Sequence, residues 1–258
     1  MTILSFLLTR RLGTIPLMQK QDHRHRVAAE RRERMRARLL ASAMSLVAEK
    51  GPAATSIDDV ISAAEVSRGT FYKYFPSPDA LVRELAIEIA NELIGMAEPV
   101  VQSYSDPAER VSCGMRLVAR LAIDHPLAAT FLVRLGWPDA RGPNILLDFV
   151  KRDLTQGIRQ GRFARMPIAL ALNIVTGAVL GATHCMLEPG CDSDFAEQSA
   201  ASALRGLGVD AKSAERIANS PLKPVEILPE GLLTDTSKIL PPAAAKTTPH
   251  GVGRRKLS

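Results

Sequence analysis

The stretch Ser67 to Phe75, with the sequence SRGTFYKYF, combines side chains that can bind a polyanion. Arg68 and Lys73 supply positive charge, and the hydroxyl of Tyr72 can donate a hydrogen bond to a phosphate. Gly69 costs a helix roughly 1 kcal/mol relative to alanine, but it lets the backbone approach another surface closely. This combination favours nucleic-acid binding over the alternative, a plain helical hairpin whose polar face contacts only solvent.

Two short helices must position this polar face. Apolar residues recur at helical spacing over residues 57–64, and the serine and threonine before them can cap that helix. Residues 65–66 interrupt the pattern, and Ser67 can cap a second helix. In this second helix Phe71 and Phe75 lie four residues apart and are expected to point inward. The order helix, turn, helix is the one that a helix-turn-helix DNA-binding motif requires.

The chain resembles the tetracycline-repressor (TetR) family of bacterial transcription regulators from about Arg32 to Leu85. The resemblance rests on MRARLLASAMSLVAEKG, ATSIDDVISAAEVSRGTFYKYF and PSPDALVREL, which are more specific than a generic helix-turn-helix pattern. It implies an all-α homodimer, in which a three-helix homeodomain-like head binds double-stranded operator DNA. A helical body is then expected to bind a small-molecule effector and the partner subunit. The DNA contacts implied by motif position are Thr55, Ser67, Arg68, Gly69, Thr70, Tyr72 and Lys73.

Two residues depart from the family pattern. Glu65 stands where the family usually has a turn glycine, so a slightly different turn is expected. Pro78 stands where a lysine often contacts a phosphate from the fourth helix, so that contact is expected to be missing.

Charge is distributed unevenly along the 258 residues, whose net charge is +6. Residues 1–80 hold 13 Lys and Arg against 8 Asp and Glu, and residues 81–219 hold 14 against 16. A basic head on a mildly acidic body indicates a protein that meets nucleic acid at one end. Because helical periodicity dominates and strand patterns are absent, we expect an all-α chain with four parts. These are a disordered arm over 1–29, a helix-turn-helix domain over 30–77, an effector-binding and dimerisation domain over 78–219, and a disordered, proline-rich tail over 220–258.

The N-terminal arm has two further interpretations. Its brief apolar run precedes the arginines, which is the wrong order for a secretory signal, and the true start of translation is either Met1 or Met18. Alternatively, a basic arm reaches phosphates or the minor groove. The arginines available for this are Arg24, Arg26, Arg31, Arg32, Arg34, Arg36 and Arg38.

The body shows no paired carboxylates beside a histidine, no phosphate-binding loop and no nucleophile elbow, so we do not expect an enzyme. A long helix from Asp79 to about Gln102 starts beside the head and can transmit motion to it. The few aromatic residues favour an aliphatic or acyl effector. Candidate effector-binding residues, each of which could also be ordinary core, are Met115, Phe131, Trp137, Phe149, Asn173, Thr176 and His184, with Val118 and Leu135 beside them.

Residues 166–187 contain no charged side chain. Such a run can cross a membrane, but it also suits a helix buried between two subunits. We expect this helix and the next one, over 194–207, to form a four-helix bundle with their symmetry mates. The predicted interface residues are Gly177, Gly181 and Leu204.

The three cysteines are an odd number and no pair has metal-ligand spacing, so neither a disulfide framework nor a metal site is expected. No cofactor is expected either. A minor alternative is that His184 and Cys185, with Cys191 and Asp192, hold a metal or sense oxidation.

The sequence therefore predicts a cytoplasmic, ligand-responsive transcriptional repressor that binds a near-palindromic operator as a dimer. Two alternatives stay open: a membrane-anchored regulator, and a helical ligand-binding protein or enzyme with a non-functional head.

Overall fold

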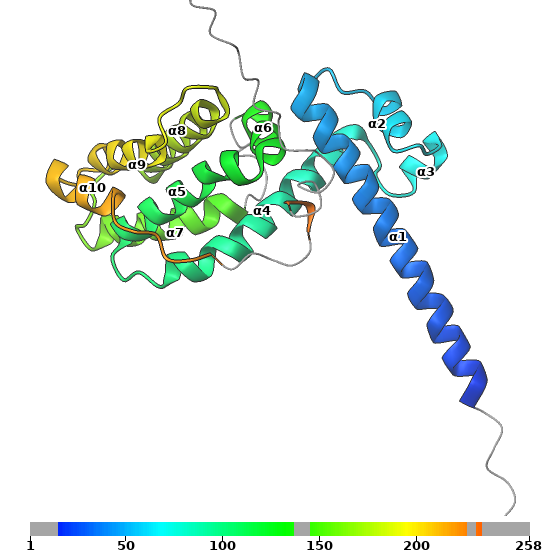
Figure 1. Ribbon diagram of the computed structural model, residues 1–258. Helices are drawn as coiled ribbons and strands as arrows, with labels where there is room; N and C mark the ends of the chain where they lie inside the picture. The colour runs from blue at the N-terminus through cyan, green and yellow to red at the C-terminus, as the bar shows by residue number, and fades with distance from the viewer. Residues whose placement is uncertain (1–14, 137–144, 226–230, 234–258) are drawn as a thin grey trace, which may run out of the picture.

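The computed structural model describes residues 15–136, 145–225 and 231–233, with side-chain positions for those from residue 26 onward except residue 145. These residues form ten α-helices and no strand, as predicted. Figure 1 shows a small head and a larger body connected by α4. The helices of the head are α1 (Ile15–Lys50), α2 (Ile57–Ala63) and α3 (Arg68–Tyr72). Those of the body are α4 (Pro78–Gln102), α5 (Pro107–Asp124), α6 (Pro126–Leu135), α7 (Ile145–Arg159), α8 (Ile168–Leu187), α9 (Phe195–Gly206) and α10 (Ala211–Ala218).

Helix α1 is 36 residues long, and its N-terminal half extends beyond the head as a straight rod (Figure 1). The predicted disorder over 1–29 is therefore wrong for Ile15 to Ala29, which are helical. Glu30 forms ion pairs with Arg26 at 3.8 Å and with Arg34 at 3.6 Å, both at i,i+4 spacing. Such pairs stabilise a helix that has few tertiary contacts.

The body is built in layers around α5 (Figure 1). Helices α8 and α9 cover one side of α5, and α4 and α7 cover the other. One core lies among α5, α7, α8, α9 and α10 and centres on the fully buried residues Leu154, Leu204, Leu207 and Ile217. A second core joins the head to the body, because α6 packs against α1 and the α1 residues Leu39 and Met44 belong to the same cluster as Phe131 of α6.

Part of the predicted disordered tail is ordered. Leu232 and Leu233 are buried in the core shared by head and body. Their backbone N–H groups donate to the carboxylate of Glu92 on α4, at 2.6 and 2.9 Å. Residues 222–225 also pack against the body. The expectation of disorder over 220–258 is therefore wrong for these residues.

Candidate DNA-binding surface and effector cavity

A capping box fixes the start of α2. The Ser56 hydroxyl accepts a hydrogen bond from the Asp59 backbone N–H at 3.2 Å, and the Asp59 carboxylate accepts one from the Ser56 backbone N–H at 2.9 Å. Lys50, the last residue of α1, reaches the same carboxylate at 2.7 Å. The hydrogen bonds from Lys50 and Ser56 hold the pKa of Asp59 well below its usual value. Asp59 therefore stays charged and joins the end of α1 to the start of α2.

The turn between α2 and α3 is made by a residue in the left-handed region. Glu65 has φ +49°. Its backbone N–H donates to the Ser62 carbonyl at 3.1 Å, and the N–H of Val66 donates to the Ile61 carbonyl at 2.9 Å. These two bonds define a Schellman motif, which usually places glycine where Glu65 stands. Glu65 therefore forms the turn that glycine usually forms, and the expectation of a slightly different turn is wrong. The Glu65 carboxylate forms an ion pair with Arg38 at 2.6 Å.

Helix α3 presents its polar face because its aromatic face is buried. Ser67 caps the helix by accepting a hydrogen bond from the Thr70 backbone N–H at 3.1 Å. Phe71 is fully buried and Phe75 is nearly so, and their ring centroids lie 6.0 Å apart. The side chain of Tyr72, in contrast, is 49% exposed.

The seven predicted DNA-contact residues differ in exposure and in the partners they already have. Thr55 is half-buried and its hydroxyl donates to the Gly51 carbonyl at 2.8 Å. Arg68 forms an ion pair with Asp58 at 2.6 Å. Among the described residues, the Tyr72 hydroxyl and the Lys73 ammonium have no hydrogen-bond or ion-pair partner. The exposed members of the set are Ser67, Arg68, Gly69, Tyr72 and Lys73, and Thr70 is half-buried.

Pro78 is the first residue of α4, where its missing N–H and fixed φ suit a helix start. Ser77 caps this helix by accepting from the Ala80 backbone N–H at 3.1 Å. The position therefore offers a well-formed helix start but no cation.

A long cavity of about 830 Å³ lies in the body between α4, α5, α6, α7 and α8. Its lining is mostly apolar, and residues 222–225 close one side. Along α4 the lining runs from Ala86 to Val101, and along α5 it runs from Arg110 to Asp124. At 1.5 Å per residue, both stretches span about 20 Å. The cavity therefore extends about 20 Å along these two helices.

Only some of the predicted effector-binding residues line this cavity. Met115, Phe149 and Thr176 do, as do Val118 and Leu135. Phe131 is fully buried in the core shared by head and body, whereas Asn173 and His184 lie on the exposed face of α8. These three do not line the cavity, because helical spacing alone does not show which face of a helix meets an internal space. Trp137 lies outside the described residues.

Two polar residues that the sequence did not single out lie at opposite ends of the cavity. Arg110 is 7% exposed and donates through Nη2 to Gln156 at 2.6 Å. Its buried Nε lies 3.2 Å from the carboxylate of Asp153 in an ion pair, although the N–H is not aligned for a hydrogen bond. His125, between α5 and α6, has a buried Nδ1 that also lacks a hydrogen-bond partner in the described part of the chain. An arginine within the apolar pattern of α5 was the one sequence signal that could have revealed this site.

The predicted interface residues fall into two groups. Gly177 and Gly181 lie on the exposed face of α8, where Leu170 is 49% exposed. Leu204 of α9 is instead fully buried within its own subunit, so its assignment to a subunit interface is wrong. Helix α8 is the one helix in the described chain that is long and apolar enough to cross a membrane. Only 22% of its apolar window is buried, so most of this apolar surface has no partner within the subunit.

The cysteines also differ from the prediction. Cys185, near the end of α8, forms a disulfide bond with Cys191 in the following loop. The expectation that no disulfide would form is therefore wrong for this pair, which a spacing of six residues did not reveal. Cys113 is buried, and this burial raises the pKa of its thiol to about 11. Among the described residues, no three potential ligands gather in a way that could hold a metal ion.

Comparison with known proteins agrees with this geometry in both parts of the chain. Residues 39–85 match the family described as bacterial regulatory proteins of the tetR family, and residues 106–220 match the tetracyclin repressor-like C-terminal domain. The helix-turn-helix transcriptional repressor Rv3405c of Mycobacterium tuberculosis (strain H37Rv) is 30% identical over 165 residues, which cover 62% of this chain and 80% of that protein.

The solved structures of RolR have the same fold. RolR without ligand is 30% identical, with a TM-score of 0.58, and the match covers 74% of this chain and all of RolR. RolR in complex with its ligand resorcinol is 28% identical, with a TM-score of 0.54, and covers 77% of this chain and all of that one.

Proposed function

The chain belongs to the tetracycline-repressor family of helix-turn-helix transcriptional regulators, and we propose that it is a repressor released from its operator by an elongated, mainly apolar ligand. The observation that carries the DNA-binding half is the outward face of α3, held by the buried rings of Phe71 and Phe75. Tyr72 and Lys73 on this face have side chains available for phosphates and base edges. The other proposed contacts are Thr55, Ser67, Arg68, Gly69 and Thr70.

We infer a dimer from the exposed face of α8. This helix contains no Lys, Arg, Asp or Glu, yet Leu170, Gly177 and Gly181 face outward. A second subunit would remove this apolar surface from water, and the glycines would let two backbones approach closely. The opposite face of α8 already packs on α5 and α9, so an interface between subunits accounts for the helix better than a membrane span does. Two heads fixed by such a dimer would reach successive major grooves of a near-palindromic operator, about 34 Å apart.

The shape of the cavity supports a long ligand. A cavity of about 830 Å³ that extends about 20 Å along α5 is larger and longer than a single phenolic ring needs. Its apolar walls suit an aliphatic chain. At one end the guanidinium of Arg110, whose Nε lies 3.2 Å from Asp153 without an aligned hydrogen bond, offers a cation for the polar head of such a ligand. His125 offers a second polar group at the other end. We propose an acyl-type ligand, in contrast to the resorcinol bound by RolR.

Ligand and operator would be coupled through α4. This helix lines the cavity from Ala86 to Val101 and starts beside α3 at Pro78. Helix α6, which also lines the cavity, packs against α1 of the head. A ligand that binds better to a conformation with displaced heads would lower operator affinity, and one that binds both conformations equally would not.

The proposal is tested by two titrations on the full-length protein. In the first, a labelled duplex from upstream of its own gene should bind with higher affinity than a random duplex. In the second, fatty acids of increasing chain length should raise the melting temperature and release the duplex. Affinity should rise by about 0.8 kcal/mol per methylene until the chain fills the cavity, and then level off. Equal affinity for the upstream and random duplexes would contradict the proposed operator binding. Binding of resorcinol, together with fatty-acid affinities that do not depend on chain length, would contradict the proposed acyl-type ligand.

A further inference from the structure

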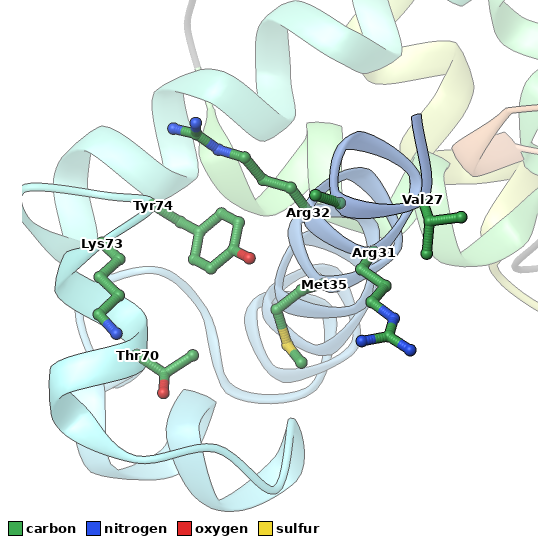
Figure 2. Close-up of a pocket in the computed structure, with 8 residues that line it drawn as sticks. Val27, Arg31, Arg32, Met35, Thr70, Lys73 and Tyr74 are labelled. Carbon is green, nitrogen blue, oxygen red and sulfur yellow. The ribbon is translucent and has the colours of Figure 1, made fainter. Parts of the chain in front are cut away.

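An open groove of about 900 Å³ separates the N-terminal half of α1 from α3 (Figure 2). Figure 2 shows Arg31, Arg32 and Met35 on the α1 side and Thr70, Lys73 and Tyr74 on the other. We call this the α1–α3 groove; Val27 and Ala28 complete its lining. It shares Thr70 and Lys73 with the polar face of α3, so anything bound to that face lies beside the groove.

Among the described arginines of α1, the two that lack an acidic partner line this groove. Six arginines lie between residues 26 and 38, and four of them are ion-paired. The pairs are Arg26 and Arg34 with Glu30, Arg36 with Glu33, Glu84 and Glu88, and Arg38 with Glu65. Arg31 and Arg32 form no ion pair within the described residues, and neither does Lys73 across the groove. Three uncompensated positive charges therefore line a single groove.

Both arginines are exposed and diverge from α1. Successive residues on a helix point in different directions, and Figure 2 shows Arg32 extending on the side of Tyr74 while Arg31 extends away from it. One compact anion would not meet both guanidinium groups. A chain of evenly spaced anions would, because each group could reach a different member of the chain.

We propose that the α1–α3 groove binds the sugar–phosphate backbone of DNA, with Arg31 and Arg32 contacting different phosphates beside the stretch read by α3. These contacts lie outside the helix-turn-helix motif and carry no sequence information, since phosphates are the same in every sequence. The inference rests on DNA binding by the head, and it does not depend on the operator sequence or on the effector.

The test compares two charge-matched double variants of the full-length protein. Arg31→Ala with Arg32→Ala removes both proposed contacts. Arg26→Ala with Arg34→Ala removes the same charge from the same helix, at arginines that pair with Glu30 and do not line the groove. Affinity for the upstream duplex and for a random 30-base-pair duplex is measured by fluorescence anisotropy between 50 and 200 mM salt.

Each lost phosphate contact should lower the slope of log affinity against log salt by about 0.9. Two contacts in each of two subunits give a change of about 3.6, so raising the salt from 50 to 200 mM should cost the wild type about 100-fold more affinity than it costs the groove variant. Arg31→Lys with Arg32→Lys should keep the wild-type slope. Equal slopes for the groove variant and its matched control, with the preference for the upstream duplex intact, would overturn the groove proposal and leave the proposed function standing. If the wild type itself binds the upstream and random duplexes with equal affinity, the proposed function is refuted instead.

Discussion

Substitution of Glu65 tests the geometry of the helix-turn-helix directly. Its φ of +49° lies in the left-handed region, which costs a residue with a side chain about 1 kcal/mol more than it costs glycine. Glu65→Ala keeps that cost and loses an exposed ion pair with Arg38 worth only a few tenths of a kcal/mol. Glu65→Gly loses the same pair but relieves the backbone. We therefore expect the glycine variant to unfold with a free energy about 1 kcal/mol higher than that of the alanine variant.

Urea denaturation followed by circular dichroism, at one fixed protein concentration, measures this difference. Because both variants lose the same carboxylate, their comparison isolates the backbone contribution. Glu65→Asn provides a third point, since asparagine tolerates this conformation better than alanine, and should fall between the two. An alanine variant as stable as the glycine variant would show that residue 65 does not adopt the left-handed conformation, and the Schellman turn described above would be incorrect.

Three further predictions concern the body and the start of α4. Glu197→Ala should destabilise the protein by about 3–5 kcal/mol, because it removes the carboxylate that lies 3.0 Å from the buried Arg116. Thermal unfolding measures this loss, and Glu215→Ala, at an exposed position, is the control and should change stability little. For Asp106, burial opposes ionisation, but hydrogen bonds from Arg162 and the Ala108 N–H outweigh it and lower its pKa. The stability advantage of wild type over Asp106→Asn should therefore be present at neutral pH and shrink as the pH falls below about 4, and an advantage that persists unchanged at pH 3 would contradict this assignment. Pro78→Lys should add one phosphate contact per subunit and steepen the salt dependence of DNA binding by about 0.9 for each contact; an unchanged slope would show that this position does not reach the backbone.

The head could be predicted from the sequence because its signals are local. Ser67, Phe71 and Phe75 are separated by one or two helical turns, so capping and burial follow from spacing alone. The outcome agrees for the burial of both rings and for the cap. The left-handed conformation of Glu65 was not predicted, because glutamate seldom adopts it.

The body was harder to predict because its decisive contacts are not local. Periodicity placed Leu204 on an apolar face, but it could not tell a face buried inside the subunit from one that meets a partner. The same limit explains Phe131 and His184, which lie on helices near the cavity yet point elsewhere. Leu232 and Leu233 lie in a proline-rich stretch that resembles a linker. Their hydrogen-bond partner Glu92 precedes Leu232 by 140 residues in the sequence, so no local pattern reveals the contact.

The ordered part of the C-terminal segment contributes to both the cavity wall and the packing between head and body. Residues 222–225 form one wall of the cavity, and the two leucines beyond them are fastened to α4 at Glu92. Truncation of the chain after Asn219 would remove one wall of the cavity and two buried leucines from the core shared by head and body. Proteolysis within this segment would thus loosen both the cavity wall and the packing between head and body, through residues remote in sequence from either.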